Sequence, residues 1–223
     1  MNPLFEYFRD NQGRLIDKWL HYFDIYHRHF SMLRGQQITL VEFGVFHGGS
    51  LQMWKNYFGP KARIVGVDID PRCKSLEEDQ IEIYIGDQED CNFLQQFRSE
   101  IGPIHILIDD GGHTMGQQIT TFQQMFSAVA VPGIYLVEDL HTSYWDNYGG
   151  GYKRAGTFIE YSKDLIDQLN AWYSRDTLEL SISDFTKTVL GMHYYDSILV
   201  IEKSAKAKPR YARTGTPSFP SNQ

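Results

Sequence analysis

The chain has 223 residues, which is enough for one ordinary domain with a sizeable buried core. Hydrophobic residues make up 42% and charged residues 22%, as in globular proteins and unlike disordered or fibrous ones. The formal net charge of -7 argues against a nucleic-acid-binding surface, which normally carries a basic excess. We therefore expect a small-molecule substrate as the partner and no nucleic acid.

The first 37 residues form an aromatic-rich segment that we predict to be helical. Such a segment either packs against the sheet or serves as a lid over a site or a dimer contact. It shows no secretory signal, and the chain has no apolar stretch long enough to cross a membrane. Two cysteines, Cys73 and Cys91, lack metal-ligand spacing and are interpreted as reduced thiols. These features predict a cytoplasmic protein with no membrane partner.

Residues 38–202 alternate short β-branched runs with longer amphipathic stretches, a rhythm typical of α/β architecture. The runs predict parallel strands, and the stretches between them predict helices with one apolar face. A mostly parallel sheet with an antiparallel ending is therefore expected. The predicted strands are 39–43, 64–68, 81–85, 104–109, 133–138, 178–185 and 194–202, and the predicted helices are 50–58, 92–101, 116–130 and 158–174.

The last segment, residues 203–223, holds five basic residues and no acidic one. Its Pro, Ser, Thr and Lys content offers little apolar surface, which predicts a flexible, solvated arm. The alternative is that it docks on a partner subunit. We expect the assembly to be a homo-oligomer, a dimer or larger.

A glycine-rich turn follows the first predicted strand and reads VEFGVFHGGS. Its glycines let the backbone approach a ligand closely, but their spacing fits neither the dinucleotide fingerprint nor the P-loop. The next two strands end in polar groups: Asp68 could accept the hydroxyl hydrogens of a ribose, and Asp87, next to Gln88, could bind an adenine amino group. Each aspartate alone fits a turn or a helix cap equally well. Three successive polar strand ends together favour a ligand site.

Two further strands end in paired carboxylates, Asp109-Asp110 and Glu138-Asp139. Four like charges at one sheet edge repel each other unless a cation neutralises them, and a hard divalent ion such as Mg²⁺ suits oxygen ligands. We predict Asp110, Glu138 and Asp139 as metal ligands, with helix caps and solvated turn charges as the alternative. Adjacent strand residues point in opposite directions, so Asp109 is expected to face the cofactor.

Two histidines follow these carboxylates. His113 lies three residues beyond Asp110 and is predicted to be a general base, since the pKa of histidine is tunable near neutrality. A purely structural histidine in a glycine-rich turn is the alternative. His141 is the second candidate, as either base or ligand.

The segments VEFGVFHGGS, GVDID and GDQED resemble the methionine loop, the ribose segment and the adenine segment of class I S-adenosylmethionine-dependent methyltransferases. The resemblance covers roughly residues 38–202. It implies a Rossmann-like fold with a seven-stranded, mostly parallel sheet, an antiparallel last strand and helices on both faces. It also implies that Gly44 approaches the methionine part of the cofactor, with Glu42 and Ser50 close by.

The motifs IDDGGH and VEDLHTSYW are similar to those of the macrocin O-methyltransferase and cephalosporin-hydroxylase-like group, in which sugar hydroxyls of macrolides are methylated with Mg²⁺. The similarity implies Asp110, Glu138 and Asp139 as ligands and His113 as base. It predicts a Mg²⁺-dependent O-methyltransferase acting on a small polyhydroxylated substrate, such as a sugar of a natural product. The aromatic N-terminal segment and the glycine-rich loop at 148–152 depart from the group's pattern and leave the substrate open.

Two other classes of function compete with this prediction. One is an NAD-dependent oxidoreductase on a Rossmann fold, for which Asp68 would also bind a ribose; the loop spacing and the acidic strand ends disfavour it. The other is a non-catalytic cofactor-binding protein, since a fold does not imply a function. The intact acidic cluster argues against that reading. The loop 143–152, with Tyr144 and Trp145, is either a lid that stacks on a sugar or ring, or a surface loop anchored by its aromatic residues.

Overall fold

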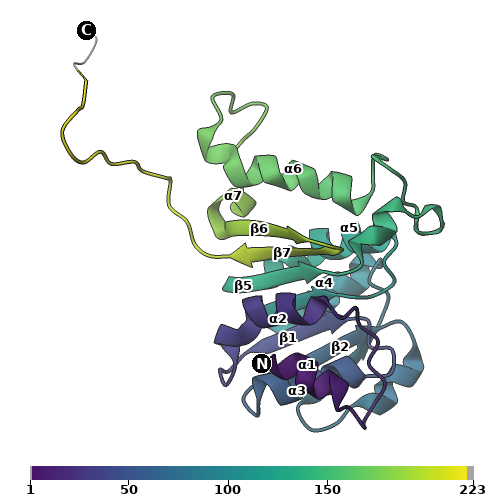
Figure 1. Cartoon of the computed structure of the whole chain (residues 1–223). Coiled ribbons are helices and arrows are strands. Elements are labelled where there is room, and N and C mark those ends of the chain that lie inside the picture. Colours follow the sequence, from purple (N-terminus) through teal and green to yellow (C-terminus); the bar gives the residue numbers. More distant parts are fainter. Residues whose placement is uncertain (1, 220–223) are drawn as a thin grey trace.

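The computed structural model describes residues 2–219 and shows one seven-stranded sheet with the order β3-β2-β1-β4-β5-β7-β6 (Figure 1). Strands β1 to β5 pair in parallel, and β7 is antiparallel to both β5 and β6. The predicted mostly parallel sheet with an antiparallel last strand is confirmed. The strands are β1 (Thr39–Phe43), β2 (Arg63–Asp68), β3 (Ile81–Ile85), β4 (Ile104–Asp109), β5 (Val129–Val137), β6 (Val189–Tyr195) and β7 (Ile198–Lys203).

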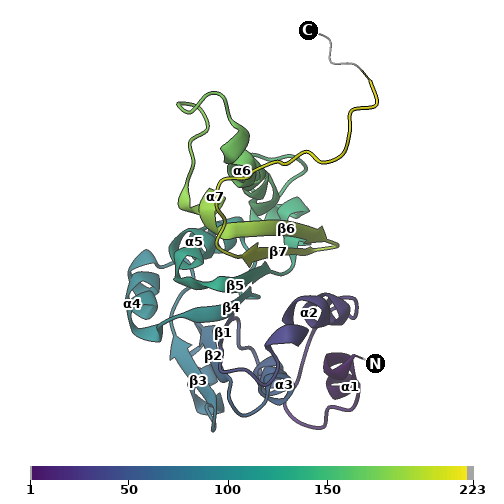
Figure 2. The same ribbon diagram turned by 90° about the vertical axis from the view of Figure 1, so that its left-hand side faces the viewer.

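Helices cover both faces of the sheet (Figure 2). Alternate strand residues point to opposite faces, so Leu40 of β1 packs in one apolar cluster and Val41 in the other. One face carries α1 (Pro3–Arg9), α2 (Tyr22–Phe30) and α3 (Gly49–Phe58); the other carries α4 (Cys91–Ile101), α5 (Met115–Met125), α6 (Phe158–Asn170) and α7 (Asp184–Thr188). Because both faces are covered, a ligand can reach the strands only at their ends.

Local capping fixes where the helices near these strand ends begin. The Asp90 side chain accepts hydrogen bonds from the first backbone N–H groups of α4. Thr114 and Gln117 form a capping box at the start of α5, five residues after the end of β4 at Asp109. The chain therefore leaves the carboxyl end of β4 through a short, fixed turn.

The N-terminal segment forms two short helices rather than one continuous helix. Residues 10–21 between α1 and α2 contain neither helix nor strand, because Asn11 and Gly13 form a turn in which the Asn11 side chain accepts from the Gly13 amide. Helix α2 packs on the sheet through Tyr26 and Phe30, whose rings contact Trp54 of α3. This packing brings residues 10–21 to the carboxyl ends of the strands.

The prediction of a strand at 178–185 is wrong. Leu178 is 95% exposed, and Ser183 caps the short helix α7 with a capping box to Thr186. The edge strand is instead β6, and a tight turn at Asp196 and Ser197 joins it to β7. The predicted strand 194–202 therefore merged the end of one strand, a turn and most of the next.

The predicted helix 116–130 also runs too far. Helix α5 ends at Met125, a single 3₁₀ turn follows, and β5 already begins at Val129. Val129 and Val131 are β-branched, and Val131 precedes Pro132, which disfavours helical backbone. The helical spacing of the apolar residues continued past the point where the backbone becomes extended.

The C-terminal residues 204–219 form neither helix nor strand and extend away from the body of the molecule (Figure 1). The last four residues of the predicted arm lie outside the described part of the chain. Between residues 2 and 219, no helix is both long enough and apolar enough to cross a membrane.

Candidate active site

A cavity of about 580 Å³ opens at the carboxyl ends of β1, β2, β3 and β4. This is the edge at which open α/β sheets bind their ligands, and the volume suits a small molecule. Residues from the N-terminal segment, including Asp17 and Lys18, close one side of it. The predicted site residues in its wall are Gly44, Ser50, Asp68, Asp87, Gln88 and Asp110.

The glycine-rich turn shapes the cavity through its backbone. Gly44 has a φ of +94°, and a Cβ atom there would collide with the carbonyl oxygen of Asp110. Asp68 holds the same turn: its Oδ2 accepts from the amides of Val45, at 2.8 Å, and Phe46, at 3.1 Å. The turn is thus fixed by a glycine that fits against β4 and by a carboxylate at the end of β2.

In the cavity wall, the Gln88 side chain connects Asp109 to the turn after β4. Its Nε2 donates to Asp109 Oδ1 at 2.9 Å, and its Oε1 accepts from the Gly112 amide at 2.8 Å. Asp109 is fully buried and does not line the cavity, and burial raises the pKa of its carboxyl to about 7. Asp87 lies at the surface of the cavity, where its Oδ1 accepts from the Glu89 amide.

Glu42 is buried beneath the cavity rather than exposed in it. Its carboxylate accepts from Ser50 Oγ at 2.6 Å and from Trp54 Nε1 at 3.2 Å. Burial raises the pKa of Glu42, and the nearby ammonium of Lys18 opposes that shift. Glu42 therefore orients Ser50, which does line the cavity.

The acidic strand ends bring Asp110, His113 and Asp139 into one group whose nearest donor atoms all lie within 4.8 Å of one another. His113 Nε2 is 3.5 Å from Asp139 Oδ2 and 3.9 Å from Asp110 Oδ1. His113 and Asp139 both have left-handed backbone, with φ of 57° and 55°, which is costly for residues other than glycine. Two carboxylates and an imidazole match the ligands that divalent cations take in proteins.

Glu138, the third predicted metal ligand, lies outside this group of three. It is almost fully buried; its Oε1 accepts from the Tyr26 hydroxyl at 2.6 Å, and its Oε2 lies 3.0 Å from Lys18 Nζ. The same ammonium forms a close ion pair with Asp110 Oδ2 and lies 3.5 Å from Glu42 Oε1. Asp110 is thus shared between the group of three and the group around Lys18.

Lys18 is charged in this environment. Burial by itself would lower the pKa of its ammonium, but Asp110, Glu138 and Glu42 together raise that pKa well above its usual range. Burial raises the pKa of Glu138, with Asp110 adding to the rise and Lys18 opposing it. The buried acids are therefore balanced by one positive side chain from the N-terminal segment.

Sequence reasoning missed three side chains of this site, all from the N-terminal segment. Lys18 and Tyr26 bind Glu138, and the Tyr22 hydroxyl donates to Asp139 Oδ1 at 2.7 Å. The partners in these three contacts are between 112 and 120 residues apart in the chain. No motif spacing could have revealed these contacts, although a lone lysine within an aromatic segment was a visible signal.

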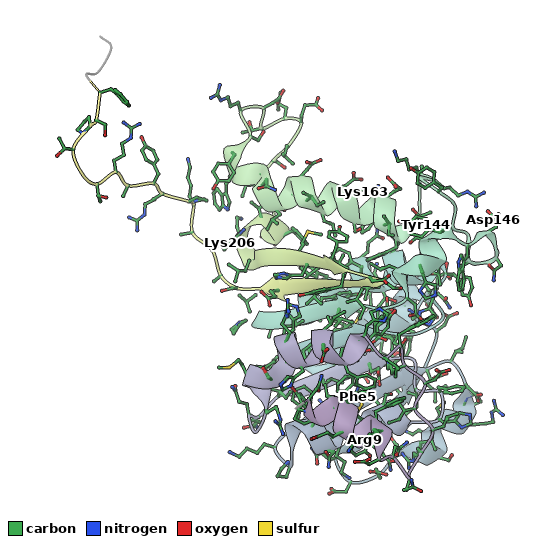
Figure 3. The ribbon with its side chains drawn as sticks, viewed as in Figure 1. Phe5, Arg9, Tyr144, Asp146, Lys163 and Lys206 are labelled. Atoms are coloured by element: carbon green, nitrogen blue, oxygen red, sulfur yellow. The ribbon has the colours of Figure 1, made fainter. Side chains whose placement is uncertain are left out.

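An aromatic row borders the acidic group on its outer side. The ring of His141 contacts Trp19 at 5.8 Å and Trp145 at 4.5 Å between centroids, and Trp145 contacts Tyr148 at 5.9 Å. His141 Nδ1 lies 2.6 Å from Ser197 Oγ and 4.0 Å from Asp139 Oδ1. Figure 3 shows Tyr144 and Asp146 on the loop that carries this row outward from the end of β5.

No family model matches the chain. It is 37% identical over 207 residues to the 8-demethyl-8-(2-methoxy-alpha-L-rhamnosyl)-tetracenomycin-C 3'-O-methyltransferase of Streptomyces olivaceus, covering 86% of this chain and 52% of that protein. It is 33% identical to demethylmacrocin O-methyltransferase of Streptomyces fradiae, covering 87% of this chain and 52% of that protein. Among solved structures, the MycE methyltransferase from the mycinamycin biosynthetic pathway, in complex with Mg and SAH, superposes with a TM-score of 0.80 at 32% identity, over 92% of this chain and 54% of that one.

In fold and in sequence the chain resembles class I S-adenosylmethionine-dependent methyltransferases. Its relatives are sugar O-methyltransferases of natural-product pathways, which confirms the resemblance to the macrocin group. Another MycE structure is in complex with Mg, SAH and mycinamycin VI. The chain spans about half the length of the relatives that it matches.

Proposed function

We propose that this methyltransferase transfers a methyl group from S-adenosylmethionine to a sugar hydroxyl of a small natural-product glycoside, with Mg²⁺ as the metal. The observation that carries the proposal is the convergence of Asp110, His113 and Asp139 beside a cavity whose wall is a glycine-rich turn. Asp110 belongs to both the cavity wall and the acidic group. A methyl donor in the cavity would therefore lie next to a hydroxyl held at the acids.

The cavity fits the cofactor in shape and in donor set. Because Gly44 packs against the backbone of Asp110, the turn itself lines the cavity, and Ser50 offers a hydroxyl there. The carboxylates of Asp68 and Asp87 line the next two strand ends, where ribose hydroxyls and an adenine amino group would donate to them. We assign Glu42, Gln88 and Asp109 to the same task, with Glu42 and Asp109 acting through the side chains that they orient.

The acidic group fits a divalent cation because its oxygen atoms converge and because two strained residues hold them there. We propose Asp110, Glu138 and Asp139 as the ligands. When bound, the cation supplies positive charge that lowers the pKa of an acceptor hydroxyl. The carboxylates orient the acceptor oxygen toward the cavity, and burial under the N-terminal segment excludes water.

We propose His113 as the base that accepts the hydroxyl proton, since its Nε2 faces Asp110 and Asp139. His141 is a second candidate because Ser197 holds its Nδ1, while its Nε2 has no hydrogen-bond partner within residues 2–219. Substitution of a histidine and substitution of a carboxylate ligand separate the role of base from the role of metal ligand. Loss of His113 or His141 as a base lowers kcat with unchanged metal affinity, whereas loss of a ligand lowers the metal affinity itself.

The aromatic row of Trp19, His141, Trp145 and Tyr148 suits the acceptor. Deoxy sugars present apolar C–H faces that stack on aromatic rings, and these rings lie beside Asp139. Trp19 and Trp145 are about half exposed, at 55% and 47%, so a ligand can reach them. The acceptor would then be held between the aromatic row and the acidic group.

Activity measurements on the purified chain test this proposal. The chain is incubated with S-adenosylmethionine and with rhamnosyl-tetracenomycin and macrolide glycosides that carry unmethylated sugar hydroxyls, and methylated products are identified by mass spectrometry. Product should form, disappear with EDTA and return with Mg²⁺. Calorimetry with S-adenosylmethionine, NAD and ATP is the companion measurement; binding of NAD alone would overturn the proposal.

We also propose a cytoplasmic homo-oligomer in which the N-terminal segment, residues 1–37, contributes a contact or a lid to the methyltransferase unit of residues 38–202. Leu15, Leu20 and Met32 support this, since each is more than half exposed on that segment. Strand β7 ends at Lys203, and residues 204–219 beyond it would remain a flexible basic tail. Sedimentation of the full chain and of a Leu15→Ser/Leu20→Ser variant tests the contact, because the variant should dissociate if this surface is buried between subunits.

A further inference from the structure

Lys18 occupies the place between carboxylates that a metal ion would need. Its ammonium contacts Asp110 Oδ2 and both oxygens of Glu138, and its side chain is only 3% exposed. Asp110 and Glu138 are two of the three ligands that we propose for the divalent cation. This ammonium opposes the binding of a divalent ion to the same two carboxylates, because like charges at short distance repel.

The donor geometry shows which carboxylates Lys18 takes from the metal. Asp110, His113 and Asp139 already face one another, whereas Glu138 faces Lys18 and Tyr26. Glu138 can join the other ligands only if the ammonium leaves it. The cofactor adds a second reason for departure, since its sulfonium is positive and Lys18 lines the same cavity.

The segment that carries Lys18 can be displaced at low cost in buried surface. It lies in residues 10–21, which have no regular hydrogen-bonded structure, and its neighbours Asp17, Trp19 and Leu20 are exposed. Ile16 and Tyr22 on either side are buried and anchor its ends. Residues 17–21 can therefore shift outward without uncovering much apolar core.

We propose that Lys18 is an exchangeable internal cation that holds Asp110 and Glu138 together before the metal arrives, and that metal binding displaces it. Displacement moves Trp19, the next residue, which belongs to the aromatic row beside Asp139. Metal loading thereby reshapes the surface that receives the acceptor. This inference rests on the proposed function, since it requires a divalent cation at Asp110 and Glu138.

Calorimetric titration with Mg²⁺ tests the exchange on the full chain without any need for activity. Lys18→Gln removes the competing charge, so it should bind Mg²⁺ about 10-fold or more tightly than the unaltered chain. Lys18→Arg keeps the charge and should bind no more tightly than the unaltered chain. Lys55→Gln, which breaks an ion pair with Glu78 outside the site, is the matched control and should leave the affinity unchanged.

Equal or weaker Mg²⁺ binding by Lys18→Gln would overturn the exchange while leaving the proposed metal site intact. Absence of Mg²⁺ binding in every form would overturn the proposed function and the exchange with it. These two failures are therefore distinguishable.

Fluorescence of Trp19 gives an independent readout that does not depend on how Lys18→Gln folds. Mg²⁺ should change the emission of the unaltered chain with the same midpoint as calorimetry, and Trp19→Phe should lose that change. The chain has four tryptophans, so the difference between the two forms isolates Trp19. Saturating Mg²⁺ with no change in this difference would overturn the displacement.

Discussion

The cofactor cavity and the acidic cluster share one edge of the sheet but are held together by different forces. The cavity is shaped by backbone: Gly44 fits against the carbonyl of Asp110, and Asp68 fixes the turn by accepting its amides. The acidic cluster, formed by Glu42, Asp110 and Glu138, is held together by charge, because all three carboxylates pair with the Lys18 ammonium. One region depends on shape and the other on a balancing cation.

This difference has a consequence for experiment. The cavity wall comes from the backbone turns after β1 to β4, so its shape does not depend on one buried charge. A cluster of buried acids needs a positive partner, and here the partner comes from outside the sheet. Substitutions should therefore affect the two regions separately.

The largest expected effect comes from removing a proposed metal ligand. Asp139→Asn or Glu138→Gln should lower methyl transfer at least about 1000-fold, because the cation's charge is worth several kcal/mol in the transition state. The affinity for S-adenosylmethionine should stay nearly the same in calorimetry, since neither side chain lines the cavity. Asp146→Asn, at an exposed carboxylate of the following loop, is the control. Parallel loss of cofactor affinity would assign these carboxylates to the cofactor instead.

The second largest effect should come from removing the positive charge of Lys18. Lys18→Met leaves buried Glu138 and Glu42 without their cation, so the free energy of unfolding should fall by about 3–5 kcal/mol in metal-free buffer. Saturating Mg²⁺ should recover part of that loss. Urea unfolding with EDTA and with Mg²⁺ measures both.

A control separates burial from charge in that experiment. Lys55 pairs with Glu78 on the surface, where both side chains are roughly 30% exposed, and Lys55→Met should cost about 0–1 kcal/mol. A loss of similar size in the two variants would mean that the acidic cluster does not rely on Lys18.

The reactivity of the Cys73 thiol tests the structure of the cofactor cavity. Cys73 lies in the cavity wall, and burial, aided by Asp68, raises its pKa to about 11. Only the thiolate reacts, so at pH 8 its alkylation by iodoacetamide should be about 100-fold or more slower than that of exposed Cys91, and should accelerate as the pH rises toward 11. Mass spectrometry of tryptic peptides measures both rates. Equally fast alkylation at pH 8 would show that the cavity is open rather than held by its turn.

The smallest expected effect lies at the aromatic row. Trp145→Ala removes one ring beside His141, which should raise the KM for the sugar acceptor about 2- to 10-fold. The KM for S-adenosylmethionine should not change. Tyr173→Ala, at an exposed aromatic residue after α6, provides the comparison. Equal effects of the two variants on the acceptor would remove the aromatic row from substrate binding.

Most of the fold follows from local patterns. The bounds of β1, β3 and β4 match those predicted, because each is a short run rich in apolar residues that ends at a glycine or an aspartate. Two predicted elements were wrong or too long. The predicted strand 178–185 contains apolar residues, but Leu178 is exposed and does not join the sheet. The predicted helix 116–130 ends early, because the backbone is already extended before Pro132.

The candidate site divides in the same way. Residues at strand ends could be placed together, because parallel strands bring their carboxyl ends to one edge. The contacts of Lys18, Tyr22 and Tyr26 depend on how the N-terminal segment packs on the finished sheet, so no spacing in the chain encodes them. The same packing explains why the neighbours Glu138 and Asp139 face different partners: Glu138 binds Lys18 and Tyr26, whereas Asp139 faces Asp110 and His113.

A crystal structure of the chain grown with Mn²⁺ and S-adenosylhomocysteine tests the central claim most directly, because anomalous scattering locates the metal without ambiguity. We predict one Mn²⁺ peak in contact with Asp110, Glu138 and Asp139, and S-adenosylhomocysteine in the cavity lined by Gly44. A structure with the product bound, no peak among these carboxylates and the Lys18 ammonium still seated on Asp110 would contradict the account.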